Sequence, residues 1–164
     1  MKSFWKNVLL TTLIAGTADI TYAYINQYIK TGKFAEKMFQ YIAGGALGLK
    51  KSIPGGIGVQ FLGLFFHYFI AFSFTLLFFL AYRALNFQKL KFHWFLLIAI
   101  LYGPFVNLFM RFIVLPLTLL PGPKTFDIKK VAIDWLFFTI VFALPIAFMT
   151  RRYYKLRQTR LTES

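Results

Sequence analysis

The chain has no cysteine and few acidic residues, and each shortage excludes a class of function. Without cysteine there is no disulfide, thiolate zinc site, iron–sulfur ligation or cysteine nucleophile. Only five residues are acidic, against 19 lysines and arginines. The two glutamates, Glu36 and Glu163, lie outside the apolar segments, so a di-iron helical bundle, which needs several buried glutamates, does not fit.

Apolar and aromatic residues dominate instead. The chain of 164 residues is 59% hydrophobic, contains 22 phenylalanines and is only 15% charged, which is too apolar for a soluble domain of this size. Four apolar segments, 7–29, 57–82, 94–116 and 131–150, are long enough to cross a bilayer core about 30 Å thick. They lack the polar–apolar alternation of a barrel. We therefore predict an all-α integral membrane protein, a single-domain four-helix bundle over residues 1–164 with a basic tail at 151–164.

The N-terminus also matches a cleavable signal peptide, with a charged start, an apolar middle and small residues at Gly16 and Ala18. The apolar character resumes after Asp19 in "ITYAYI", which makes the run long enough to span a membrane. We therefore expect a first span here and not a leader that is removed.

The longest connection, residues 30–56, contains the apolar stretch "FAEKMFQYIAGGALGL", which is too short to cross a bilayer. Lysines flank it on both sides, a pattern that predicts an amphipathic helix lying at the interface or partly re-entering the membrane. The segment "GGALGLKKS" lacks the Gly-Lys-Ser/Thr of a phosphate loop, so no nucleotide site is expected.

An even number of spans places both chain termini on one side of the membrane. That side would carry slightly more lysine and arginine, including the basic tail, which predicts cytoplasmic termini. The net charge of +14 is explained by loop residues that face the lipid bilayer and its anionic headgroups. Nucleic acid is not an expected partner, because no basic stretch lies within a soluble motif.

A carboxylate, Asp19, interrupts the first apolar segment at "LIAGTADITYAYI". A charge near the middle of a bilayer costs about 2.5 kcal/mol or more, so Asp19 should face protein. Its helical face carries other small and polar residues: Thr12, Ala15, Gly16, Ala23 and Asn26. The second segment has a matching stripe: Gln60, Gly63, His67, Ala71 and Thr75. Antiparallel packing of the two segments would bring His67 to the depth of Asp19, so an Asp–His pair is predicted.

The third and fourth segments add further polar residues. Asn107 and Arg111 share a face with Gly103, and Asp134 lies near the start of the fourth segment. Counted from the predicted ends, Arg111 and Asp134 fall toward the same side of the bilayer, which predicts a structural ion pair between them. The predicted ligand or proton site consists of Asp19, His67, Asn107 and Arg111.

The polar residues of the four apolar segments do not match the residue sets of known kinds of enzyme active site. A lone buried histidine could ligate one haem, but nothing else marks a haem pocket, and we expect no cofactor and no metal. A Ser-His-Asp hydrolase needs a nucleophile, and Ser73 lies off the face of His67.

The stretches "GLFFHYFIAFSFTLLFFLAYRALNFQKLKFHWFLLIAILYG", "FIVLPLTLLPGP" and "LPIAFMTRRY" resemble small four-span bacterial inner-membrane proteins of the YagU type. The shared elements are the Asp of "AGTAD", the Gly-Gly before the second span, His67, the "VLPL" exit from the third span and the basic end of the fourth. The resemblance implies a bacterial inner membrane. It also implies a histidine near the start of the fourth span, where this chain has Asp134, so metal or proton chemistry at that position is not carried over.

Two classes of function remain. The first is binding or conduction of a small polar species or a proton, since histidine is the side chain best suited to change charge near neutral pH. The second is a structural or assembly subunit whose phenylalanine-rich faces dock onto lipid or a larger membrane complex. A membrane-embedded enzyme acting on a lipid fits less well. Four helices enclose little space, so a transporter of this size would often form a homo-oligomer.

Overall fold

The computed structural model describes residues 2–121 and 128–162, and these residues are almost entirely helical. Helix makes up 87% of the described residues, and they contain no strand, which confirms the predicted all-α class. The elements are α1 (Lys2–Thr31), α2 (Met38–Leu47), α3 (Leu49–Ser52), α4 (Ile57–Ala84), η1 (Phe87–Lys89), α5 (Phe92–Phe109), η2 (Met110–Val114), η3 (Leu115–Leu117), α6 (Ile128–Phe138), η4 (Thr139–Ala143) and α7 (Leu144–Thr162). The turns η2 and η4 are wide π-helical turns.

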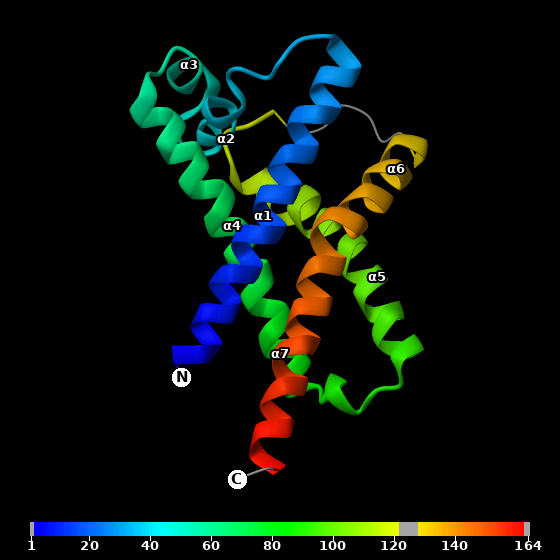
Figure 1. Ribbon diagram of the computed structural model, residues 1–164. Coiled ribbons are helices and arrows are strands. Elements are labelled where there is room, and N and C mark those ends of the chain that lie inside the picture. The colour runs from blue at the N-terminus through cyan, green and yellow to red at the C-terminus, as the bar shows by residue number, and fades with distance from the viewer. Residues whose placement is uncertain (1, 122–127, 163–164) are drawn as a thin grey trace.

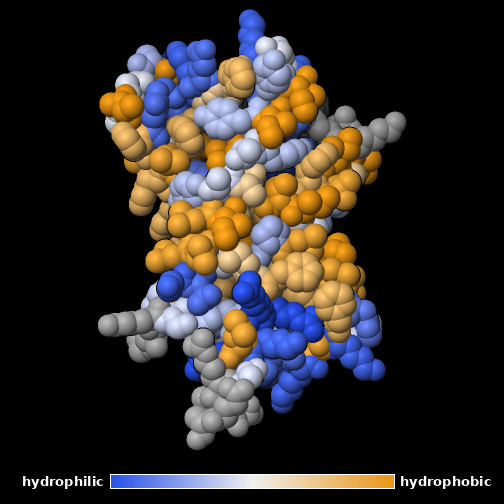
Figure 2. All heavy atoms as spheres, viewed as in Figure 1, coloured by the Kyte–Doolittle hydropathy of each residue, from blue (hydrophilic) through white to orange (hydrophobic). Residues whose placement is uncertain are grey.

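Four stretches of helix are long enough and apolar enough to cross a membrane, which confirms the predicted number of candidate spans. We call them spans 1 to 4, and they cover Ser3–Thr31, Ile57–Ala84, Phe92–Leu117 and Val131–Thr159. Span 4 continues past the predicted boundary at 150, because much of the basic tail is helical too. Figure 2 shows apolar residues across the middle of the face in view, with hydrophilic residues gathered toward both ends.

The helices cross near the middle of the molecule, and both chain termini lie at the same end (Figure 1). Helix α1 packs against α4 on one side and against α7 and η4 on another, while α5 packs across η4. The polar stripes predicted on spans 1 and 2 face inward, since all their members are buried or partly buried. Span 1 therefore holds a central position, in contact with both span 2 and span 4.

The short helix α2 lies in the predicted connection between spans 1 and 2, at the end away from the termini (Figure 1). It packs against the first half of α4, where any Cβ at Gly63 would overlap the backbone of Phe39. The Leu119 amide, which follows η3, donates a hydrogen bond to the Gly45 carbonyl at 2.9 Å. Close backbone contact thus fixes α2 to both span 2 and the end of span 3.

Aromatic rings fill the space between α4 and α5. The rings of Phe78 and Tyr102 lie edge to face with centroids 4.7 Å apart, and Tyr82 and Phe95 meet in the same way at 6.2 Å. The Tyr102 hydroxyl donates a hydrogen bond to the Phe74 carbonyl at 2.6 Å. The abundance of phenylalanine therefore serves packing inside the bundle as well as on its outer faces.

Prolines account for the irregular turns of spans 3 and 4. A proline cannot donate to the carbonyl four residues earlier and its ring crowds that carbonyl, and a local widening of the helix relieves both problems. Each wide turn ends two residues before a proline, η2 before Pro116 and η4 before Pro145. Within α5, Pro104 frees the Ile100 carbonyl, which accepts a hydrogen bond from the Thr139 hydroxyl at 3.4 Å.

The hydrogen bond from Thr139 predicts a specific energetic coupling. Substituting Thr139→Val should lower the free energy of unfolding by about 1 kcal/mol, because the Ile100 carbonyl loses its donor in an apolar setting. In a Pro104→Ala background the new backbone N–H can serve that carbonyl, so the same substitution should cost close to nothing. A double-mutant cycle in detergent, unfolded with SDS, measures the difference. Equal costs in both backgrounds would contradict this account.

Candidate functional site

The histidine of span 2 is hydrogen-bonded to the backbone of span 1. His67 is buried, and its Nε2 lies 2.8 Å from the Gly16 carbonyl oxygen. Because a carbonyl only accepts, Nε2 must carry a hydrogen and donate it, which leaves Nδ1 as the nitrogen that can gain or lose a proton. At about 1.5 Å per residue, His67 lies about 15 Å from the start of α4, well inside the span.

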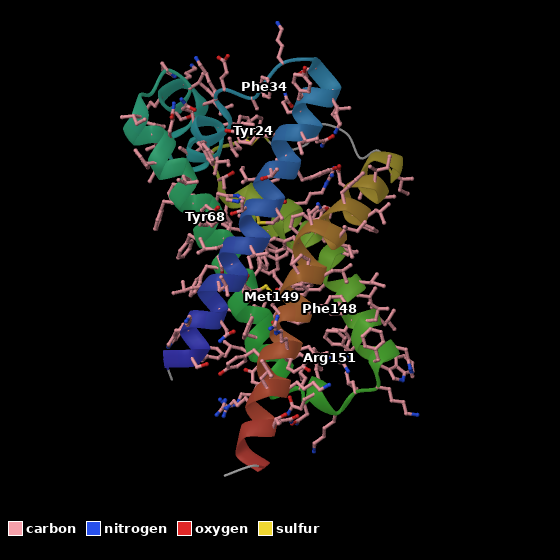
Figure 3. All side chains as sticks on the ribbon, viewed as in Figure 1. Tyr24, Phe34, Tyr68, Phe148, Met149 and Arg151 are labelled. Carbon is pink, nitrogen blue, oxygen red and sulfur yellow. The ribbon has the colours of Figure 1, made fainter. Side chains whose placement is uncertain are left out.

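Small residues allow α1 and α4 to approach each other at the level of His67. A Cβ at Gly16 would lie 3.0 Å from the ring of Tyr68 and 3.3 Å from the Cβ of Ala71. The next residue on each helix forms a second link, in which the Thr17 and Tyr68 hydroxyls are hydrogen-bonded at 2.7 Å. Figure 3 shows Tyr68 on α4 beside α1. Two adjacent hydrogen bonds thus fasten span 1 to span 2.

Asp19 lies three residues after Gly16 on α1 and is partly buried. Its carboxyl is within electrostatic range of His67, so the structure brings these two titratable side chains together. The hydroxyl of Tyr22, one turn further along α1, is within range of both Asp19 and Asp134. The four side chains form a series that runs from α4 across α1 to α6. We call Asp19 and His67 with their immediate contacts the Asp19–His67 site.

The other predicted site residues lie on span 3. The Asn107 side-chain oxygen accepts a hydrogen bond from the Trp135 indole at 3.1 Å, so it is directed to span 4. Arg111 is partly buried in the wide turn η2. Asp134 is partly buried on α6, and its carboxyl is within electrostatic range of the Tyr22 hydroxyl. The ion pair between Arg111 and Asp134 stays a prediction.

An open groove of about 790 Å³ runs along α1 beside the end of α6 and the turn η4. Most of its lining is apolar, but Thr17, Thr21 and Tyr22 contribute hydroxyls. Tyr22 and Phe137 both line the groove, and their rings stack on each other with centroids 4.9 Å apart. The groove therefore lies between spans 1 and 4, and Asp19 is not part of its lining.

Three residues at the site were missed by the sequence argument. Tyr22 lies three positions after Asp19, so the helical spacing that selected the stripe could also have found it. Thr17 and Tyr68 each follow a predicted inward-facing residue, and only the crossing of the two helices shows that they meet. Tyr68 is partly buried within α4, and nothing in the sequence alone separates such a tyrosine from an aromatic residue that faces lipid.

Comparison of the chain with models of protein families, with curated proteins and with solved structures finds no match. The resemblance to four-span bacterial inner-membrane proteins of the YagU type therefore stays a prediction. Function is inferred below from the contacts of the Asp19–His67 site.

Proposed function

We propose that the protein binds or conducts a proton, or another small polar species, across a bacterial inner membrane through the Asp19–His67 site. The observation that carries this proposal is a carboxyl and an imidazole on facing helices, within electrostatic range of each other and inside two candidate spans. Charged groups are costly in lipid, so two of them are best explained if binding of a proton or ligand changes their charge.

Polar groups continue from the Asp19–His67 site toward both ends of the bundle. On one side, Tyr22 and Asp134 extend the series toward the start of span 4. On the other, the Thr11 and Thr75 hydroxyls are fully buried and have no hydrogen-bond partner among the described residues. Each of these threonines lies eight residues, about 12 Å, from Asp19 or His67 on the same helix. This distribution supports a polar route through the bundle rather than one isolated pair.

The same proposal places the termini in the cytoplasm and α2 along the opposite membrane interface. The basic residues around the ends of spans 2 and 4 support that orientation, since lysine and arginine are enriched in cytoplasmic loops. Exposed Phe34, before α2, and exposed Tyr41, within α2, are suited to contact with the headgroup region.

Proton movement can be measured in proteoliposomes that contain a pH-sensitive dye and an imposed potassium gradient with valinomycin. The potassium diffusion potential drives protons across the membrane, and vesicles with wild-type protein are expected to change their internal pH faster than protein-free vesicles do. Asp19→Asn and His67→Gln should each reduce the rate to the protein-free level, because neither new side chain titrates. Both replacements keep a hydrogen-bonding group of similar size, so the protein should still fold.

Matched control variants change the same kinds of group outside the site. Glu36→Gln alters an exposed acid in the connection after span 1, and His93→Gln alters an exposed histidine at the start of α5. Both should keep the wild-type rate. A parallel swelling assay with small polar solutes tests the wider form of the proposal. Folded wild-type protein that is inactive in both assays, or a folded Asp19→Asn variant with full activity, would refute it.

A structural or assembly role is the second candidate, and the hydrogen bond from His67 to the Gly16 carbonyl favours it. Such a bond fastens two helices whether or not anything moves between them. In that case His67→Ala lowers thermal stability in detergent, and no flux is found that Asp19→Asn removes. The two candidates therefore give opposite results in the proteoliposome experiment.

A further inference from the structure

A cavity of about 750 Å³ opens at the end of the molecule where both termini lie. It is bordered by the start of α1, the end of α4 and the middle of α7, and three arginines line it: Arg83, Arg152 and Arg157. Arg83 and Arg157 are both within electrostatic range of the Tyr154 hydroxyl, so cations from two helices converge there. We call this cavity the arginine pocket.

The arginine pocket is strongly positive. The acids in the described part of the chain are Asp19, Glu36 and Asp134, and none of them lines it. The first turn of α1 contributes further positive potential, because the initial N–H groups of a helix have no acceptor within the helix and lie at the positive end of its dipole. This concentration of cationic groups favours an anion as the ligand.

The remaining lining indicates what carries the anion. Leu10, Leu80 and Met149 line the pocket on the side nearer the middle of the molecule, and Figure 3 shows Met149 further from the C-terminus than Arg151 on α7. Trp5, about half exposed, belongs to the same wall and is a residue type enriched at membrane interfaces. Cationic groups at one end of the cavity and apolar groups at the other fit an amphipathic ligand.

We propose that the arginine pocket binds the phosphate of an anionic phospholipid, with its acyl chains along Leu10, Leu80 and Met149. Guanidinium groups pair with phosphate oxygens through two parallel N–H···O bonds, and basic pockets between membrane helices are suited to such headgroups. Inorganic phosphate offers the same anionic chemistry without the chains. This site is separate from the Asp19–His67 site and does not depend on any transport activity.

Lipid retention tests the proposal directly. The full chain is reconstituted in nanodiscs with equal amounts of phosphatidylglycerol and phosphatidylcholine, released, and analysed by native mass spectrometry. Wild-type protein should retain phosphatidylglycerol selectively, and the triple variant Arg83→Gln, Arg152→Gln, Arg157→Gln should bind it roughly a hundredfold more weakly. The three arginines are exposed, so this variant should keep the helical content of the wild type by circular dichroism.

A matched control removes the same charge from the same end outside the pocket. The variant Lys89→Gln, Lys91→Gln, Lys155→Gln changes three exposed lysines that do not line the cavity, and it should retain phosphatidylglycerol like the wild type. An equal loss in this control would show a diffuse charge effect and overturn the pocket. Undiminished retention by the arginine variant would overturn it as well.

Thermal unfolding in neutral detergent separates the two sources of phosphate. Phosphatidylglycerol should raise the unfolding temperature of the wild type and not that of the arginine variant, whereas inorganic phosphate at the same concentration should have little effect. Equal stabilisation by inorganic phosphate would assign the pocket to a soluble anion and overturn the lipid proposal.

Discussion

Replacing Gly63 by alanine is expected to destabilise the protein by about 3 kcal/mol, because the added methyl has no room. The nearest atoms are the carbonyl oxygen, carbonyl carbon and Cα of Phe39, all of them backbone, so no side chain can rotate away. Relief requires α2 to move off α4. SDS-driven unfolding in detergent measures the loss, and hydrogen exchange at the amides of Met38–Leu47 should increase if α2 is the element that separates.

The matched control is Gly58→Ala in the same helix. A Cβ at Gly58 meets nothing within 4 Å, and alanine is the better helix former, so stability should be unchanged or slightly higher. A loss at Gly58 as large as the loss at Gly63 would mean that the helix, and not its contact with Phe39, is sensitive. Wild-type stability of the Gly63 variant would contradict the close approach of α2.

Replacing Phe95 by alanine should cost about 4 kcal/mol, the value typical of a fully buried aromatic residue. Phe95 is 0% exposed and contacts Tyr82 and Phe148, and the Arg151 guanidinium lies 4.5 Å from its ring centroid. One nitrogen of Arg151 is buried without a hydrogen-bond partner among the described residues, so the ring is part of what stabilises the charge. Thermal unfolding followed by tryptophan fluorescence provides the measurement.

Two further variants separate packing from charge at Phe95. Phe92→Ala removes the second ring near Arg151, at 5.1 Å, but Phe92 is 55% exposed and should cost far less. Phe95→Leu keeps much of the volume and loses the cation–π contact, so its cost should fall when Arg151→Met is also present. Additive costs for the last two changes would show that the ring and the guanidinium are not coupled.

Much of the architecture could be predicted from the sequence because the bilayer imposes simple rules. Apolar length gives the number of candidate spans, and helical spacing gives the inward faces, so the stripes containing Asp19 and His67 were found without a structure. The proximity of these two residues followed from antiparallel packing alone. Each of these inferences needs only one helix, or two helices adjacent in the chain.

The contacts between helices that are distant in the chain depend on which helices are neighbours. Neither the helical spacing of apolar residues nor the composition determines that. The sequence predicts Asn107 as a site residue, but it does not show that the Trp135 indole donates a hydrogen bond to the Asn107 side-chain oxygen. Tyr68 looks like an outward-facing aromatic residue until the crossing angle brings it to Thr17. The arginine pocket is not predicted by the sequence for the same reason. Arg83 and Arg157 are far apart in the chain and come together only when α4 packs against α7.

The wide turn η4 determines how span 4 follows its neighbours. Buried or partly buried residues recur at every fourth position through it: Val131, Trp135, Thr139, Ala143 and Ala147. Four residues of an ideal α-helix rotate by about 40° more than one full turn, so an unbroken helix would carry this row gradually away from the bundle or force it to wind around its partners. The extra residue in η4 absorbs that drift. Span 4 can therefore keep the same side against the bundle on both sides of η4, so the packing needs no supercoil.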